Sequence, residues 1–172
     1  AILAAFVAML WLTLERPPLR TMGETRLWYS LFLLLSGLVT YVRWRYRWIM
    51  GFSTMLATVF MIINIAKPEL HDHTLMPALQ SPWFVPHVSV YMFSYALLGC
   101  ATLLSVYGLW RPSAELDKAI NRVMSSGIAF FTIGMLSGAL WAKEAWGTYW
   151  NWDPKEAWAA ATWGLYLLAL HI

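Results

Sequence analysis

Long apolar runs constrain the fold of this chain more than any other feature. Hydrophobic residues make up 60% of the sequence and charged residues 12%, whereas a soluble domain carries about 25% charged residues. A helix needs about 20 apolar residues to cross a hydrocarbon core about 30 Å thick. We therefore predict an all-α fold, a polytopic transmembrane helix bundle with about six spans, at residues 1–14, 27–42, 48–66, 86–110, 123–142 and 155–172.

The loops between these spans alternate between the two sides of the membrane. Basic residues are concentrated in the short segments 43–47 and 111–122. Short loops rich in Lys and Arg remain in the cytoplasm under the positive-inside rule. We therefore place these two segments inside, and the loops 15–26, 67–85 and 143–154 outside. Because the first and last apolar runs are short, we expect the chain to be part of a longer protein.

Tryptophan is concentrated in one short stretch near the carboxyl end. Six of the 12 tryptophans lie between Trp141 and Trp163. Gly147, Asp153 and Pro154 interrupt this stretch, so the indoles do not form a single lipid-facing stripe. An aromatic belt at the membrane interface is one interpretation. The other is a wide aromatic surface with polar edges, which suits a large, flat, mostly apolar ligand at the membrane boundary.

The external segment 143–156 ends in a helix-start signal. Asp153 is suited to capping, Pro154 to the first helical position, and Glu156 to reaching back as in a capping box. Asp153 is therefore either a helix cap or a direct contact of the ligand.

Two histidines lie at different depths. His87 follows Pro86 in the first turn of a predicted span, at the outer boundary, on a helix face that continues through Tyr91 and Tyr95. His171 lies 17 residues beyond Pro154, about 25 Å deeper at 1.5 Å per residue. An ionisable side chain at that depth is costly and usually functional, although a neutral His bonded to another helix is the alternative. Neutral imidazole is an ordinary axial ligand of haem iron.

Three further residues are candidates for a functional or structural role. His71 and His73 lie in a proline-bounded loop, where they either are solvated or hold a metal or ligand. Cys100 is the single cysteine, so it forms no internal disulfide and is expected to be a small buried residue. The absence of Cys-x-x-Cys in this sequence argues against a thiol–disulfide carrier.

The tryptophan-rich stretch resembles a known family. The run Trp-Gly-Thr-Tyr-Trp-Asn-Trp-Asp-Pro-Lys-Glu-Ala-Trp at 146–158 is similar to the WWD signature of haem-handling cytochrome c biogenesis proteins. Its Asp-Pro-Lys-Glu-x-Trp ending resembles the CcsA/ResC branch, the system II cytochrome c synthases, whereas CcmC-type relatives diverge after the Asp. Residues 86–96, 138–142, and the Arg-Pro-Pro-Leu at 16–19 with Glu24 also resemble that branch.

The resemblance implies a function in cytochrome c biogenesis. Members of this family are thought to convey haem b across the membrane and present it on an external WWD platform, where thioether bonds form with the Cys-x-x-Cys-His of apocytochrome c. It implies that His87 and His171 are axial ligands of the haem iron. The second external histidine of the family would lie beyond residue 172. The cofactor-binding platform would comprise Trp146, Trp150, Trp152, Asp153 and Trp158.

The resemblance also implies partners and a location. We expect residues 1–172 to form a single transmembrane haem-handling domain with holocytochrome c synthase (haem lyase) activity. It would act in the lipid bilayer with a CcsB/ResB-type membrane partner, fused or separate, and without nucleic acid. The bacterial cytoplasmic membrane is the expected location, with a thylakoid membrane as the alternative.

Competing functions remain at this point. A CcmC-like haem exporter or chaperone would lack synthase activity, and an unrelated transporter subunit would use the tryptophans structurally. A fixed haem electron carrier is disfavoured, because its histidine pair would lie at similar depth.

Overall fold

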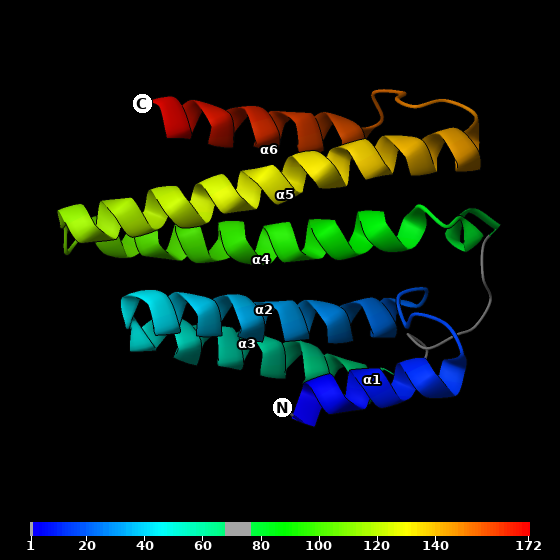
Figure 1. Ribbon diagram of the computed structural model, residues 1–172, viewed down its shortest axis with the longest axis horizontal. Helices are drawn as coiled ribbons and strands as arrows, with labels where there is room; N and C mark the ends of the chain where they lie inside the picture. The colour runs from blue at the N-terminus through cyan, green and yellow to red at the C-terminus, as the bar shows by residue number, and fades with distance from the viewer. Residues whose placement is uncertain (1, 68–76) are drawn as a thin grey trace. The chain divides into compact units, whose positions relative to one another are not determined.

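The part of the chain that the structure describes consists of helices and the loops that join them. The computed structural model describes residues 2–67 and 77–172, and contains no strand within them. Its helices are α1 (Ile2–Leu14), α2 (Met22–Trp44), α3 (Arg47–Ala66), the short 3₁₀-helix η2 (Pro77–Gln80), α4 (Phe84–Gly108), α5 (Ala114–Trp146) and α6 (Pro154–His171). Figure 1 labels the α-helices. The all-α prediction is confirmed.

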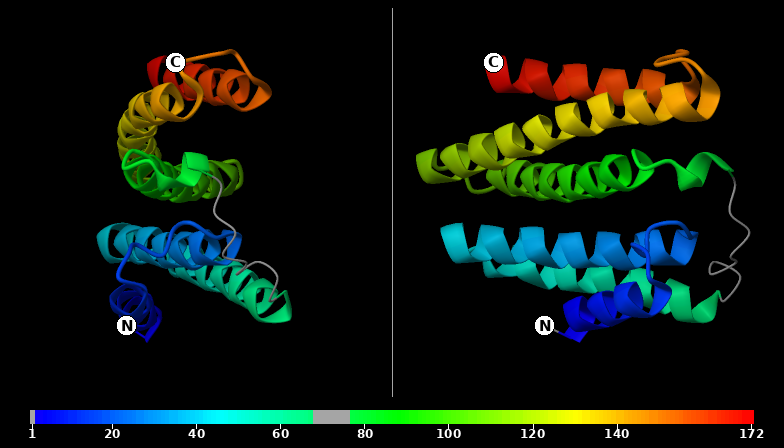
Figure 2. Two further views of the ribbon diagram at one scale, coloured as in Figure 1. Left: turned by 90° about the vertical axis from the view of Figure 1, so that its right-hand side faces the viewer. Right: turned by 45° about the vertical axis from the view of Figure 1, so that its right-hand side comes forward.

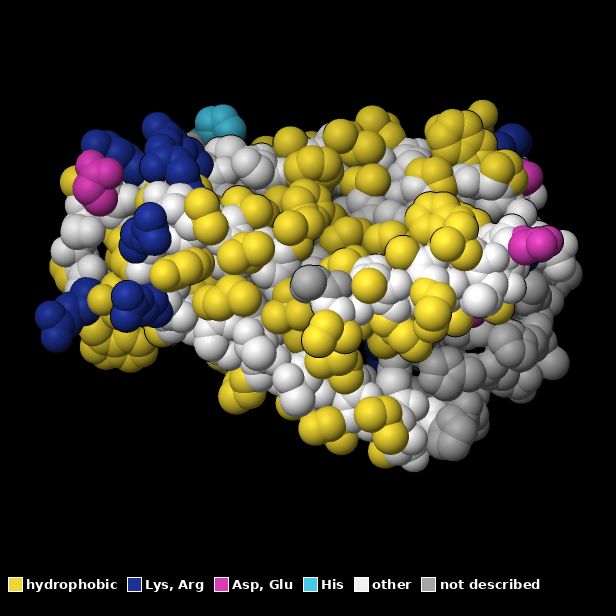
Figure 3. Space-filling view, turned by 60° about the horizontal axis from the view of Figure 1, so that its bottom comes forward, with side chains coloured by type: hydrophobic (Ala, Val, Ile, Leu, Met, Phe, Trp, Pro, Cys, Tyr) yellow, Lys and Arg dark blue, Asp and Glu magenta, His cyan; other side chains and the backbone are white. Residues whose placement is uncertain are grey.

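The helices define a multi-pass membrane protein. Four of them, α2 to α5, are long and apolar enough to cross a membrane, and α1 is apolar but shorter. Each of the six predicted runs coincides with a helix, although α6 is not among these four. Hydrophobic side chains are spread over the middle of the face seen in Figure 3, and Lys and Arg side chains gather at one end of it, as expected for a surface that meets lipid.

Two helices, α2 and α5, begin more than one turn earlier than the apolar pattern predicted. The chain becomes helical at Met22 rather than at residue 27, because Thr21 and Glu24 form a capping box. The pattern Thr-x-x-Glu before an apolar run is the sequence signature of this motif. The segment 15–26 is therefore partly helical rather than a loop throughout.

The second early start belongs to α5, which spans 33 residues instead of the predicted 123–142. The Ser113 hydroxyl accepts a hydrogen bond from the Leu116 N–H at 3.2 Å and caps the helix. At 1.5 Å per residue α5 is about 50 Å long, so it exceeds a hydrocarbon core of about 30 Å. Its polar ends therefore extend beyond the apolar part, and the predicted loop 111–122 is mostly helical.

The chain divides into two compact units, residues 1–80 and 81–172. In the first unit, α2 and α3 pack side by side and antiparallel, joined by a tight turn in which Arg45 has a φ of 64°. The Asn64 side chain donates to the Gly23 carbonyl at 2.9 Å. The assignment of one haem-handling domain to residues 1–172 stays a prediction.

An ion pair closes the amino-terminal end of α2. The Arg16 guanidinium donates to both oxygens of the Glu24 carboxylate, at 2.9 and 3.1 Å. The same carboxylate accepts the backbone N–H groups of Arg20 at 2.8 Å and Thr21 at 3.2 Å. Glu24 is buried, with 3% of its surface exposed. The Glu24 carboxylate is therefore paired and hydrogen-bonded by groups of this unit.

The second unit consists of the α4–α5 hairpin with α6 packed on α5, as Figure 2 shows. The Trp163 indole on α6 donates to the Thr132 hydroxyl on α5 at 2.9 Å. The Tyr166 hydroxyl is 3.0 Å from the Thr102 hydroxyl on α4. These two polar contacts fix α6 beside both helices of the hairpin.

Candidate functional site

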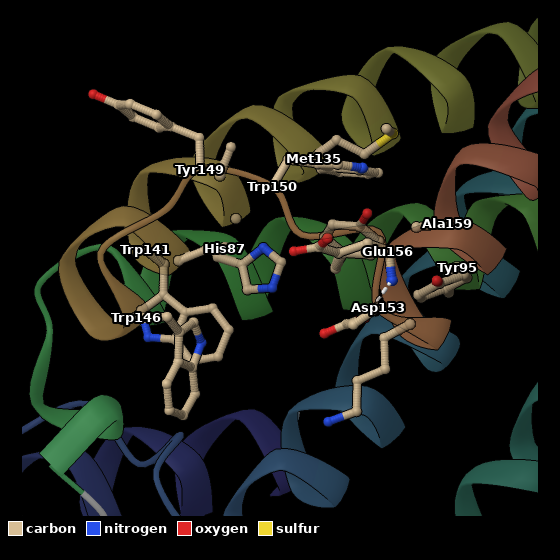
Figure 4. A pocket seen from close by; sticks show the side chains of 15 residues that line it. His87, Tyr95, Met135, Trp141, Trp146, Tyr149, Trp150, Asp153, Glu156 and Ala159 are labelled. Carbon is tan, nitrogen blue, oxygen red and sulfur yellow. Dashed lines mark hydrogen bonds between the residues drawn. The ribbon is translucent and has the colours of Figure 1, made fainter.

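An open pocket lies at the end of the second unit where α4 begins, α5 ends and α6 begins. Its empty space, including the part that is continuous with solvent, is about 730 Å³. Its walls are mostly aromatic, with charged groups at the start of α6 (Figure 4). The larger side chains that line the pocket are His87, Tyr91, Tyr95, Met135, Trp141, Trp146, Tyr149, Trp150, Asp153, Lys155 and Glu156.

His87 projects into this pocket from the first turns of α4 (Figure 4). Its Nδ1 atom is 2.9 Å from the backbone carbonyl of Gly134 on α5. A carbonyl only accepts, so Nδ1 carries the hydrogen and Nε2 of the neutral ring keeps a lone pair. The two nitrogens of an imidazole point in divergent directions. Nε2 is therefore available to a ligand in the pocket.

The indoles around His87 do not share one plane. Trp141 stacks on the His87 ring with centroids 5.6 Å apart and planes 13° apart. Trp146 meets Trp141 edge to face at 6.2 Å, and Trp150 meets Trp152 edge to face at 5.6 Å. The aromatic wall thus presents faces as well as edges, which are the two ways in which aromatic rings contact one another favourably.

Trp150 contributes an unpaired polar group to the wall. Its indole Nε1 atom is buried and has no hydrogen-bond partner among the described residues. A buried donor without a partner costs about 1–3 kcal/mol. An acceptor on a molecule bound in the pocket would remove this cost.

The loop 147–153 that carries Trp150 has a defined shape. It leaves α5 at Gly147, which has a φ of 85° and whose carbonyl accepts from Lys143 Nζ at 2.8 Å. The Lys143 ammonium also lies 5.3 Å from the centre of the Tyr149 ring. Trp152 has a φ of 57°, a left-handed conformation that is rare for a bulky residue.

Asp153 ends the loop as the cap of α6, as predicted. Its carboxylate accepts the Glu156 N–H at 2.8 Å, and Pro154 takes the first helical position. The expected capping box is not formed. Glu156 instead accepts the N–H of Asn151 at 2.7 Å, two residues before the cap, because the left-handed turn at Trp152 brings that group into reach. The two carboxylates therefore hold both the loop and the helix start.

The structure brings together four of the predicted site residues and separates three. His87, Trp146, Trp150 and Asp153 line the pocket. The other three do not line it: Trp152, which touches the edge of Trp150, and Trp158 and His171, which are exposed on α6. The proposed roles of all seven stay predictions.

His171 lies at the last position of α6 with its side chain exposed. Its Nδ1 atom is 2.8 Å from the Leu167 carbonyl of the same helix. As in His87, this bond leaves Nε2 with the lone pair of a neutral ring.

Sequence reasoning missed the residues on α5 that hold His87. Trp141, Gly134 and Gly138 contact its ring or lie directly beneath it. Tyr91 and Tyr95 were placed correctly on the face of His87, and both line the pocket. The resemblance included residues 138–142, but it did not show which of them contact His87, because the register between two antiparallel helices is set by tertiary packing.

No cluster of three or more His, Cys, Asp or Glu side chains that could hold a bare metal ion occurs in residues 2–67 and 77–172. His71 and His73 lie outside the described residues, so the alternatives for this pair stay open. Cys100 is buried, as expected.

The fold and the pocket define a helical membrane protein of several spans with an aromatic pocket at one end of a helix hairpin. Residues 19–172 match the family described as "Cytochrome C assembly protein". The chain belongs to this family and is of its CcsA type, which confirms the resemblance read from the tryptophan-rich run.

Three relatives, each named "Cytochrome c biogenesis protein CcsA", illustrate the similarity. The protein from Marchantia polymorpha is 29% identical in an alignment 225 positions long, gaps included, that covers 98% of this chain and 70% of the relative. That from Phalaenopsis aphrodite is 31% identical with the same coverage. That from Chlamydomonas reinhardtii is 40% identical over 131 residues, 69% of this chain and 37% of the relative.

Proposed function

We propose that this protein binds haem in the pocket at the start of α4 and presents it for covalent attachment to apocytochrome c. Family membership supports the coarser part, a role in cytochrome c biogenesis. The observation that carries the finer part is the free Nε2 of His87 in an open aromatic pocket.

The donor set fits iron that a macrocycle already holds. A bare ion needs several protein ligands, whereas haem iron needs only axial ones. The His87 imidazole supplies one such ligand. A metal-bound histidine usually donates its other ring N–H to a carbonyl or carboxylate, which is the arrangement that His87 has with Gly134.

The walls fit the rest of the haem molecule. Trp146 and Trp150 offer apolar surface for the ring, and each aromatic contact contributes about 0.5–1.5 kcal/mol beyond area burial. Haem also carries two propionate carboxylates. The unpaired Trp150 N–H and the Lys155 ammonium both line the pocket, and hydrogen bonds to carboxylates are among the stronger ones.

The chemistry requires positioning more than a nucleophile from the protein. Each cysteine thiol of apocytochrome c adds across a haem vinyl group, forming one C–S and one C–H bond with no leaving group. Holding the reactants in the right geometry lowers such a barrier by several kcal/mol. The pocket is open, and we propose that an apocytochrome approaches through this opening and that a CcsB/ResB-type partner completes the haem lyase.

His171 has a separate proposed role in delivery. It is exposed on α6 and its Nε2 is available, so it is suited to pairing with a histidine of another segment or partner. We expect His171→Ala to reduce haem in the His87 pocket of cells that rely on internal haem, while haem added to purified protein still binds. Normal filling of the pocket in those cells would contradict a relay role.

The membrane is also part of the proposal. We place the pocket on the external face of a bacterial cytoplasmic membrane. The relatives from Marchantia and Chlamydomonas make the thylakoid membrane the alternative. Fractionation of the source cells followed by immunodetection separates the two.

The test of the proposed function is covalent haem on apocytochrome c. The protein is co-expressed with its CcsB-type partner and an apocytochrome c, and haem that survives denaturing electrophoresis is stained. Wild type and Trp110→Phe, an exposed tryptophan at the far end of the hairpin, should give product, and His87→Ala should not. Haem bound to the protein without covalent product would indicate an exporter or chaperone, and equal product from His87→Ala would overturn the site.

A further inference from the structure

The ring of His87 contacts α5 as well as Tyr91 of its own helix, whose ring it meets edge to face at 4.9 Å. A Cβ atom built on Gly138 would lie 2.6 Å from Cε1 and 2.7 Å from Nδ1 of His87. Real Cβ atoms essentially never approach so closely. Any side chain at position 138 would therefore displace the ring, and glycine is required by contact rather than by backbone conformation.

Two further contacts on the same face of α5 hold this ring. The Gly134 carbonyl, one turn before Gly138, accepts the Nδ1 hydrogen at 2.9 Å. The Trp141 indole, about one turn after Gly138, stacks on the ring at 5.6 Å. Residues 134, 138 and 141 share one helix face because they are three to four positions apart. The ring is thus fixed at its edge, at one nitrogen and on one face.

We propose that Gly134, Gly138 and Trp141 form a cradle that positions His87 so that Nε2, and not Nδ1, faces the pocket as the iron ligand. In this account Gly138 and Trp141 are positioning residues for haem ligation. The inference rests on the proposed function, since it concerns how the haem ligand of that function is oriented.

Close packing of α4 on α5 does not by itself require this arrangement. Gly127 lies 2.6 Å, measured from its built Cβ, from the Leu98 side chain in the same hairpin. That glycine accommodates an apolar side chain, which has no nitrogen to orient. At Gly138 the space left by the missing side chain is filled by an imidazole. One nitrogen of this ring is bonded to α5, and the other faces the pocket. The Gly134 carbonyl also accepts the Ser137 hydroxyl at 3.0 Å, but Ser137 has an alternative acceptor in Ile133 at 2.9 Å.

The experiment compares two porphyrins on the purified intact protein. Haem binding is followed by the Soret band, and binding of metal-free protoporphyrin IX is followed by fluorescence. Metal-free porphyrin has no iron, so it reports the aromatic walls and the folded state alone. We expect Gly138→Ala to weaken haem binding roughly 10–100-fold, as loss of a group that orients a metal ligand does. Metal-free porphyrin binding should stay close to that of wild type, because this porphyrin has no iron for His87 to ligate.

Two matched substitutions serve as controls. Gly99→Ala places a methyl group in open space, and Gly127→Ala crowds the hairpin as strongly as Gly138→Ala does but away from the pocket. Both should keep the wild-type ratio of haem to metal-free porphyrin affinity. If Gly138→Ala does not fold, Trp141→Leu removes the stacking contact without adding atoms that crowd the ring. It should lower the same ratio.

The outcomes distinguish failure of the haem site at His87 from failure of the cradle that orients His87. If wild type and His87→Ala bind haem equally, the proposed function fails. If His87→Ala loses haem while Gly138→Ala and Trp141→Leu keep the wild-type ratio, the cradle is overturned and the haem site stands. If Gly127→Ala also lowers the ratio of haem affinity to metal-free porphyrin affinity, the effect of Gly138→Ala is due to ordinary helix packing and not to the cradle.

Discussion

The two helix hairpins use a glycine in the same way, and one ionisable side chain in each unit shows a different degree of hydrogen bonding. In the α2–α3 hairpin, a Cβ on Gly37 would meet the Ser53 hydroxyl at 2.5 Å, and in the α4–α5 hairpin a Cβ on Gly138 would meet His87. The carboxylate of Glu24 in the first unit accepts four hydrogen bonds, two from the Arg16 side chain and two from backbone N–H groups. The His87 ring bonds to Gly134 through Nδ1 and leaves the lone pair of Nε2 to a ligand. A polar group that is fully paired stabilises the fold, whereas one that is half paired is available to a ligand.

The largest expected effect on stability belongs to the ion pair of the first unit. Arg16→Ala leaves the buried Glu24 carboxylate without its guanidinium, and removal of one partner of a buried pair costs about 3 kcal/mol or more. We expect a clear drop in the thermal unfolding midpoint in detergent. Haem binding by the protein that remains folded should not change. Arg20→Ala is the control, because Glu24 accepts only the backbone N–H of Arg20; an equal loss there would contradict the pairing argument.

The next prediction compares the close-contact glycine of the α2–α3 hairpin, Gly37, with that of the α4–α5 hairpin, Gly138. Gly37→Ala forces a methyl group against Ser53, and overpacking of this kind costs about 1–3 kcal/mol. We expect lower stability with an unchanged haem affinity, the reverse of Gly138→Ala. Gly51→Ala on α3 meets open space and should behave as wild type in unfolding measurements. A lower haem affinity in Gly37→Ala would contradict the view that only the glycine of the α4–α5 hairpin affects haem binding.

A smaller effect is expected at the cap of α6. Asp153→Ala removes the acceptor of the Glu156 N–H, and loss of such a cap costs about 1 kcal/mol. Because the cap holds the loop with Trp150, haem affinity should fall about fivefold, which is the equilibrium equivalent of that energy. Asp153→Asn retains a capping oxygen and should bind haem as wild type does. If it binds as weakly as the alanine variant, the charge contacts haem directly.

The smallest effect on stability is expected at the unpaired indole. Trp150→Phe removes the buried N–H and keeps most of the aromatic surface. Stability without ligand should be unchanged or slightly higher, because an unsatisfied donor is removed. Haem affinity should fall by the equivalent of one hydrogen bond to a charged acceptor, about 1.5 kcal/mol at the low end of the range for such bonds. Titration of the Soret band measures it against Trp110→Phe, and equal affinity in the two variants would exclude a role for this donor.

Much of the fold could be predicted because it depends on local signals. Apolar runs located all six α-helices, and Asp153 with Pro154 marked the start of α6. The boundaries of α2 and α5 were wrong because hydropathy finds the apolar part of a helix and not its polar ends. Capping residues such as Thr21 and Ser113 carried that information.

The site was predicted only in part for a different physical reason. The motif located Trp146, Trp150 and Asp153, which are close in sequence. It also included Trp158, which α6 directs away from the pocket. The contacts between His87 and α5 depend on how two helices pack, and no pattern within either helix specifies which glycine faces which ring.

The measurement that tests the central claim most directly is the absorption spectrum of the purified wild-type protein and His87→Ala, each with a pyridine haemochrome assay. We predict a Soret band in wild type that is lost in His87→Ala and partly restored by added imidazole, which occupies the vacated ligand position. A haem-free wild type after supplementation, or a variant spectrum that neither falls nor responds to imidazole, would contradict a haem site in the His87 pocket.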